Sequence, residues 1–212
     1  MSNLKSVICF TGGAGGDFLK ALCLTQFPNQ SFFMIEDTGM IEYDNHYFKR
    51  KCEQCYENSL SWTTIDQLKI KPVDNTHYYF DWFTDIFSKI YYIDYPDDIV
   101  DVLIKTYITK RYRGNKEDFI ETTLAKIPPK LQKIIPRSNA LVAIGKTWIR
   151  NQHAWRTNTN MHAIKLLDIF DLPKIKEIVP EIIQKDLVDV DYFEQFHLAW
   201  TEKNQNLLHA HL

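Results

Sequence analysis

The sequence is poor in glycine, in cysteine and in long apolar segments. It contains 7 glycines and 4 cysteines among 212 residues. No stretch approaches the roughly 20 apolar residues that cross a bilayer, so no membrane segment is predicted. The apolar run after Lys5 ends at glycines, which argues against a secretory signal peptide. Two of the cysteines lie in apolar periodic segments, where a free thiol behaves as a small hydrophobe, so we expect a reducing, cytoplasmic location.

An excess of charge of either sign is also missing. Lys and Arg number 25 against 27 Asp and Glu, which gives a formal net charge of −2. This balance excludes a basic nucleic-acid coat and a disordered polyelectrolyte, and it gives no reason to expect nucleic acid or a polyanionic acceptor as a partner. Apolar residues, at 45%, and aromatic residues, at 14%, are abundant instead. They suffice for one packed domain spanning residues 1–212.

Segments with strand character alternate with segments of helical periodicity. Short apolar or Ile/Tyr-rich runs predict strands at 5–11, 31–36, 76–80, 89–95 and 162–167. Periodicity and capping residues predict helices at 17–24, 56–68, 96–113, 116–126, 138–155, 172–184 and 191–207, with Asp17, Ser138 and Asp191 as N-caps. This alternation predicts the α/β class with a mainly parallel sheet.

Glycines are concentrated between the first predicted strand and the first predicted helix. Four of the seven are Gly12, Gly13, Gly15 and Gly16, and Ala14 lies among them. A loop without Cβ atoms can turn its N–H groups toward one point, and the following helix adds a positive partial charge. The cluster therefore predicts a site for a phosphate or sulfate group, with a plain tight turn as the alternative.

Neither of the two common nucleotide-binding motifs fits this loop. The pattern G-x-x-x-x-G-K-[ST] needs a lysine and a hydroxyl after its last glycine, but Asp17 and Phe18 follow Gly16. The pattern G-x-G-x-x-G, counted from Gly13, requires glycine where Phe18 stands. An ATPase or a dehydrogenase is therefore disfavoured, and a kinase-like nucleotide-binding phosphotransferase stays only as an alternative.

The order of motifs along the chain resembles the sulfotransferases, a branch of the P-loop fold. Residues 10–19 (FTGGAGGDFL) are similar to the family's loop Y-P-K-S-G-T-T-W-L, and residues 75–77 (NTH) to its strand ending K-T-H. Residues 91–98 (YYIDYPDD) are similar to I-Y-V-V-R-D-P-R-D, and residues 162–168 (HAIKLLD) to a late strand that ends in an acid. The resemblance implies a three-layer P-loop-type fold and sulfuryl transfer from phosphoadenosine phosphosulfate to a hydroxyl on a small molecule or glycan.

The same resemblance implies roles for individual residues. His77 matches the general base, with a strand histidine packed among residues 78–80 as the alternative. Lys20 is the expected substitute for the family's loop lysine, and Arg111 and Arg113 are the expected site for the donor's 3′-phosphate. The loop residues implied to hold the sulfate and the 5′-phosphate are Gly12, Gly13, Ala14, Gly15, Gly16, Asp17 and Phe18.

Three donor-binding groups of the family have no counterpart at the matching positions. The loop lysine falls on Gly13, the arginine on Asp94, and the serine of the following helix near Val102. Replacing arginine by aspartate inverts a charge that faces a phosphate in the family, which is costly at a buried site. A degenerate member that keeps the fold as a non-catalytic binding module is therefore the main alternative function.

Other candidate chemistry in the chain is weaker. Cys52-x-x-Cys55 with His46 makes part of a zinc site, but no fourth ligand is evident, so no metal is expected. The basic clusters 49–51 and 110–113 indicate either charge at a helix end or contact with an anion. The helical spacing of Trp148 and Trp155 predicts core positions, with pocket walls as the alternative.

Overall fold

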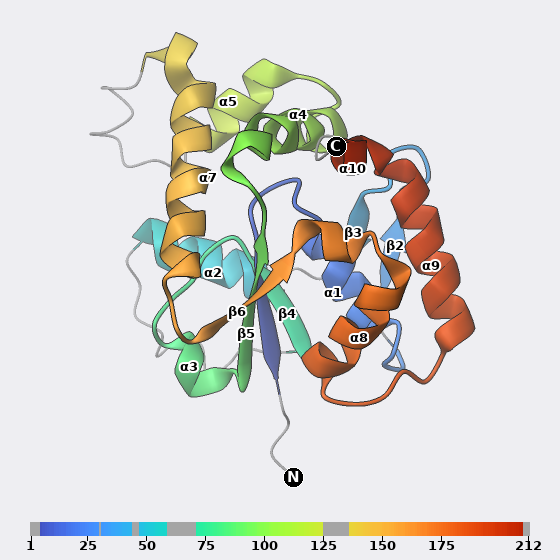
Figure 1. The fold of residues 1–212 in the computed structure, drawn as a ribbon. Helices are drawn as coiled ribbons and strands as arrows, with labels where there is room; N and C mark the ends of the chain where they lie inside the picture. The colour runs from blue at the N-terminus through green and yellow to red at the C-terminus, as the bar shows by residue number, and fades with distance from the viewer. Residues whose placement is uncertain (1–4, 30, 44–46, 59–70, 125–135, 210–212) are drawn as a thin grey trace.

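The computed structural model describes residues 5–29, 31–43, 47–58, 71–124 and 136–209. At its centre is a four-stranded sheet with the order β4-β1-β5-β6, in which every pair of neighbours is parallel (Figure 1). The strands are β1 (Ser6–Cys9), β4 (Val73–Thr76), β5 (Lys89–Asp94) and β6 (Met161–Lys165). The predicted α/β class with a mainly parallel sheet is thus confirmed for this part of the chain.

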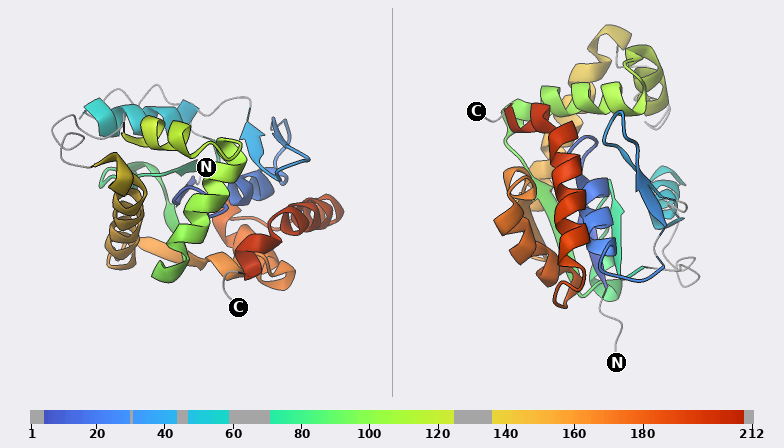
Figure 2. Two further views of the ribbon diagram at one scale, coloured as in Figure 1. Left: turned by 90° about the horizontal axis from the view of Figure 1, so that it is seen from above. Right: turned by 90° about the vertical axis from the view of Figure 1, so that its right-hand side faces the viewer.

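Helices cover both faces of the sheet because side chains alternate along each strand. Ile8 and Tyr91 point into a large core, whereas Val7 and Ile90 point into a smaller one. The large core is formed with helices α1 (Gly16–Leu24), α4 (Val100–Arg111), α8 (Leu172–Ile183) and α9 (Val190–Lys203). The smaller core is formed with α2 (Tyr47–Asn58), α3 (Phe83–Ile86) and the end of α7 (Ala140–Arg156). Figure 2 shows α2 on the opposite side of the molecule from α8 and α9.

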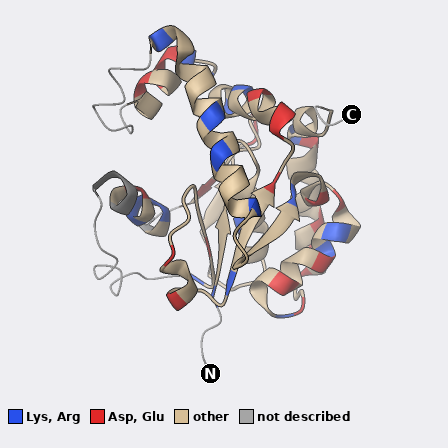
Figure 3. Cartoon of the chain, turned by 60° about the vertical axis from the view of Figure 1, so that its left-hand side comes forward, with Lys and Arg blue, Asp and Glu red and all other residues tan. Residues whose placement is uncertain are grey.

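The remaining elements lie mostly around the carboxyl ends of the strands. Helices α5 (Lys116–Leu124) and α10 (Gln205–His209) lie there beside α4 (Figure 1). An antiparallel pair, β2 (Phe32–Met34) and β3 (Ile41–Tyr43), packs beside α1. Charged residues lie mainly on the helices and loops, and α7 carries Lys and Arg but no Asp or Glu (Figure 3). Among the described helices, none is both long enough and apolar enough to span a bilayer.

One predicted strand is misplaced. The strand predicted at 76–80 is β4 at Val73–Thr76, which contains Asp74 and Asn75 and so lacks the apolar pattern of a buried strand. Most of the helix predicted at 56–68 lies outside the described residues, and its first three residues are the end of α2 (Tyr47–Asn58), a helix that was not predicted. Strand β3 was not predicted.

The three predicted N-caps are also wrong. Gly15, in the left-handed region at φ 77°, precedes α1, so Asp17 lies in the first turn and its side chain reaches toward β4. Ser138 lies in a 3-10 turn before α7, whose N-cap is Asn139. Helix α9 begins after Asp189, whose carboxylate accepts a hydrogen bond from the Tyr192 backbone N–H at 3.0 Å.

Helix α1 and strand β4 are joined by a buried ion pair. The Lys20 ammonium lies 2.7 Å from a carboxylate oxygen of Asp74, and the two side chains are 3% and 4% exposed. The other oxygen of Asp74 accepts a hydrogen bond from the backbone N–H of Lys71 at 3.0 Å. Removing either partner leaves a buried charge without compensation.

We expect Lys20→Met to lower the free energy of unfolding by about 3–5 kcal/mol, because Asp74 then stays buried without its counter-charge. The double variant Lys20→Met/Asp74→Asn removes both charges and is expected to recover a large part of that loss. Urea unfolding at pH 7 measures both. Equal losses in the single and double variants would contradict this account of the pair.

Candidate functional site

The glycine loop lies where the sheet reverses its connection order. The chain runs from β1 to β4 on one side and then crosses back to β5 on the other. In open α/β sheets, ligands bind at this point, outside the carboxyl ends of the strands. Figure 1 shows the loop after β1 at that end, facing α4.

Two loop glycines are required by close contacts. Gly13 has a φ of +82°, and a Cβ atom there would lie 2.6 Å from the carbonyl oxygen of Leu103 in α4. A Cβ atom on Gly16 would lie 2.1 Å from the ring of Phe10. The loop backbone is therefore held against α4 and against the end of β1 with no room for side chains.

A cavity of about 330 Å³ opens over this loop. Gly13, Gly15, Gly16, Asp17 and Phe18 form one wall of it. Helices α2 and α4 supply its charged side chains, apart from Asp17 of α1. The basic lining residues are Lys49, Arg50, Lys110 and Arg111, and the acidic ones are Asp17 and Glu53. The cavity thus has an excess of positive charge although the chain as a whole is slightly negative.

His77 lines the same cavity just after β4. Its Nδ1 atom lies 2.9 Å from the backbone carbonyl oxygen of Phe10, and the two rings pack with their centroids 4.5 Å apart. A carbonyl oxygen only accepts hydrogen bonds, so Nδ1 carries the proton, and in the neutral ring Nε2 is the acceptor. The histidine is both packed on an aromatic ring and placed with a basic nitrogen at the site.

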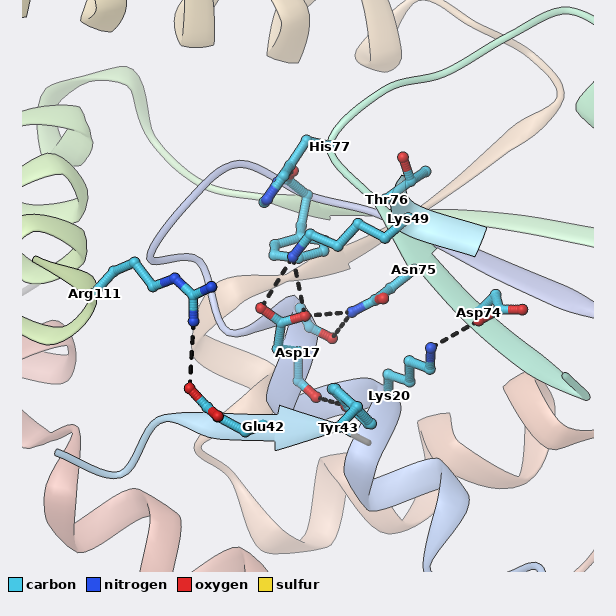
Figure 4. A network of polar contacts seen from close by, with 12 residues as sticks. Asp17, Lys20, Glu42, Tyr43, Lys49, Asp74, Asn75, Thr76, His77 and Arg111 are labelled. Atoms are coloured by element: carbon cyan, nitrogen blue, oxygen red, sulfur yellow. Dashed lines mark hydrogen bonds and ion pairs between the residues drawn. The ribbon is translucent and has the colours of Figure 1, made fainter. Parts of the chain in front are cut away.

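Asp17 is held by partners from two other elements (Figure 4). Its carboxylate accepts a hydrogen bond from Asn75 Nδ2 at 2.8 Å, and the Lys49 ammonium lies 3.3 Å from both of its oxygens. The same ammonium lies 5.0 Å from the ring centroid of Phe10, which adds a cation–π contact. Helix α2 thereby brings a cation to the start of α1.

The cation that reaches the loop is therefore not the one that the sequence indicated. Lys20 points to Asp74 and is not among the residues that line the cavity. Lys49 and Arg50 were visible in the sequence only as a basic cluster, with no local signal that α2 packs against the loop. Gly12 and Ala14 do not line the cavity. Gly12 packs against the rings of Tyr107 and Trp148, and Ala14 is buried.

The second basic cluster is divided by the end of α4. Lys110 and Arg111 line the cavity, whereas Arg113 lies beyond the helix end, exposed and outside it. Arg111 forms an exposed ion pair with Glu42 of β3 at 3.4 Å. Burial lowers the pKa of Lys110 to about 8, and its ammonium donates a hydrogen bond to the side-chain oxygen of Asn204.

The position that matches the family's arginine carries a neutralised carboxylate. Asp94 accepts a hydrogen bond from Arg156 Nε of α7 at 2.8 Å. The same guanidinium lies 3.0 Å from Asp97, which also bonds His153. Arg156 thus pairs with two carboxylates, and among the described residues it is not left free to bind a phosphate at this end of β5.

The cysteine and tryptophan candidates lie in packed surroundings. Cys52 is buried in the smaller core with Trp155, while Trp148 packs against the larger one. His46 and the Cys55 side chain lie outside the described residues. In the described ranges, no three His, Cys, Asp or Glu side chains are grouped so as to hold a metal ion.

Comparison with known proteins assigns no family to this arrangement. No protein-family model matches the chain, and searches of curated proteins and of solved structures give no match either. The resemblance to sulfotransferases therefore stays a prediction.

Gly13 and Gly114 provide a matched test of the loop packing. Both have a φ near +80°, but a Cβ atom on Gly114 would have nothing within 4 Å. We expect Gly114→Ala to cost about 1–2 kcal/mol of folding free energy for the left-handed backbone. Gly13→Ala is expected to cost about 1–3 kcal/mol more, because the new methyl group meets Leu103. Urea unfolding measures the difference, and equal costs would contradict the contact.

Proposed function

We propose that this chain transfers a sulfuryl group from a nucleotide donor to a hydroxyl acceptor. In this proposal the glycine loop binds the anionic end of the donor, and His77 takes the proton of the hydroxyl. The observation that carries it is the position of His77. Its Nδ1–H is held by the Phe10 carbonyl, and it lines the cavity that the loop and four basic side chains also line.

The strand order supports a P-loop-type architecture. The loop follows β1, an interior strand of the sheet, and leads directly into α1, so the amides of the first helical turn point out of the sheet edge. Strands β4 and β5 flank β1, which places His77 beside the loop. Amides at a helix start together with left-handed glycines favour an anion.

Proton transfer is the step that falls to His77. As the hydroxyl oxygen bonds to the sulfur, its proton passes to Nε2 of His77, and the electron pair of the broken S–O bond leaves with the nucleotide phosphate. The Phe10 carbonyl stabilises the resulting imidazolium, because it accepts the hydrogen bond from Nδ1–H. Lys49 and the loop amides offset negative charge at the reacting group, as in phosphoryl transfer.

The donor in this proposal is phosphoadenosine phosphosulfate. The residues around the loop fit its 5′-phosphosulfate end. The two positions that bind the 3′-phosphate in the family do not fit that phosphate here. Asp94 is bonded to Arg156, and Val102 has no hydroxyl and packs against the large core. The bound donor supplies a sulfuryl group activated by its bond to a phosphate. The acceptor in this proposal is a hydroxyl on a small molecule or glycan, and the free thiols of Cys9, Cys23 and Cys52 accord with a cytoplasmic location.

A non-catalytic binding module is the second candidate. Two carboxylates favour it. Asp94 occupies the position of the family's arginine, and Asp17 lies close to the position of its loop lysine. Each is paired with a basic residue, Lys49 or Arg156, which thereby loses part of its attraction for a ligand. This module would keep the cavity and bind an anion without using His77 as a base.

A ligand screen separates the candidate functions. Thermal unfolding is followed with adenosine 3′,5′-bisphosphate, ATP, GTP or sodium sulfate. We expect the bisphosphate to raise the melting temperature at concentrations where ATP and GTP do not, since a ligand that binds only the folded state stabilises it. Stabilisation by ATP or GTP alone would favour a kinase-like phosphotransferase. If none of the four ligands changes the melting temperature, both the sulfuryl-transfer and the phosphotransferase functions are contradicted.

His77→Asn tests the chemistry. The asparagine amide can still donate to the Phe10 carbonyl, but it cannot accept a proton, so we expect transfer to fall about 10²–10⁴-fold. Binding of adenosine 3′,5′-bisphosphate should be unchanged in isothermal titration calorimetry. His162→Asn, at an exposed position of β6 outside this cavity, is the matched control. Full turnover by His77→Asn would remove this residue from the mechanism.

A further inference from the structure

Lys110 differs from Lys49 and Arg111 in having no acidic partner within the described residues, and from Arg50 in being partly buried. Lys49 is paired with Asp17, Arg111 is paired with Glu42, and Arg50 is exposed to water. The Lys110 ammonium donates a hydrogen bond to the neutral side-chain oxygen of Asn204. Within the described residues, no carboxylate lies at ion-pair distance from it.

The charged groups facing Lys110 do not compensate it. On its own helix Arg111 adds a second positive charge, and from β3 Glu42 is bonded to that arginine. From α9, Lys203 is exposed and packs its stem against Gly39. Asp17 and Glu53 line the same cavity, but neither lies at ion-pair distance from Lys110, whose pKa is lowered by burial. The ammonium is therefore partly desolvated and has no carboxylate paired with it in the described part of the chain.

Such a group costs folding free energy, because desolvation penalises the charged form. Binding sites tolerate this cost where the ligand brings the missing charge. Asn204 is 2% exposed and donates from its own amide to the Trp200 carbonyl at 2.8 Å, so its oxygen is held toward Lys110. The lysine is thus oriented by a fixed partner at the α4 end of the cavity.

We propose that Lys110, oriented by Asn204, is the binding subsite for a second phosphate or sulfate group of the ligand. It lies at the α4 end of the cavity, whereas the loop and Lys49 receive the first group. The adjacent Arg111 can add a hydrogen bond to the same group. This inference rests on the proposed function in one respect, namely that the cavity binds an anionic nucleotide.

Binding at this subsite is linked to proton uptake. Below pH 8 the ammonium is already charged, so the affinity does not depend on its titration. Above pH 8 the free chain has lost that proton and must regain it on binding, so the dissociation constant rises by up to tenfold per pH unit. Phosphate monoesters keep a constant charge there, because their second pKa is about 6.

Calorimetry with two probes tests the subsite, using adenosine 5′-monophosphate and adenosine 3′,5′-bisphosphate. We expect the wild-type chain to bind the bisphosphate at least tenfold more tightly at pH 7. Lys110→Met should reduce the affinity for the bisphosphate to that for the monophosphate, and it should leave the affinity for the monophosphate unchanged. It should also abolish the rise of the bisphosphate dissociation constant above pH 8. Lys105→Met, exposed on the same helix, is the matched control and should behave as wild type.

The outcomes separate this proposal from the one on which it rests. If Lys49→Met weakens both probes and Lys110→Met weakens neither, or weakens both equally, the Lys110 subsite is overturned and the loop site stands. If Lys110→Met removes the preference for the bisphosphate while His77→Asn keeps full turnover, the Lys110 subsite is supported and the proposed role of His77 in transfer is overturned. Failure of both probes to bind the wild-type chain overturns both.

Urea unfolding supplies a readout without ligand. The pKa of Lys110 is lower in the folded than in the unfolded chain, so its charge costs stability fully below pH 8, and this cost fades as pH rises toward about 10.4. Lys110→Met should therefore unfold at a higher urea concentration than wild type at pH 7, and the margin should shrink by pH 10. A lower midpoint at pH 7 would mean that the fold itself compensates Lys110, and it would overturn the proposal.

Discussion

The close packing of the turn between β1 and α1 is the constraint on which the rest of the site depends. Gly13 lies against the Leu103 carbonyl, and Gly16 lies against the Phe10 ring. The first contact holds α4, with Lys110 near its end, over the carboxyl edge of the sheet. The second holds Phe10 where its carbonyl can accept the His77 hydrogen bond. The absence of two Cβ atoms thus brings the lysine and the histidine to one cavity.

Carboxylates determine which cations remain available at this cavity. Asp17 engages Lys49, and Asp94 engages Arg156 at the end of β5. A paired cation keeps its hydrogen-bonding atoms but loses part of its long-range attraction for an anion. The positive excess therefore falls on α4 and on the exposed Arg50, which is how a chain of net charge −2 presents a cationic pocket.

Local signals explain which elements were predicted. β5 and α4 were found because their signals, an Ile/Tyr run, Pro96 and Gly114, lie within a few residues of the elements that they delimit. β4 was misplaced because its polar residues are buried by partners far away in sequence. Asp74 is bonded to Lys20, 54 residues earlier, and Asn75 to Asp17, 58 residues earlier. No pattern within the strand itself shows that these polar side chains have partners in other elements.

The sequence alone determined the alternation of strands and helices and the position of the glycine loop, because both depend on residues adjacent in the chain. It predicted His77 inside a strand at 76–80, whereas this residue directly follows β4, which ends at Thr76. Only the tertiary structure decided which lysine serves the loop. Lys20 is nearer to the loop in the sequence, but packing brings Asp74 to Lys20 and Asp17 to Lys49. An ion pair depends on the distance between its charges in space, and that distance is set by contacts between segments that are remote in the chain.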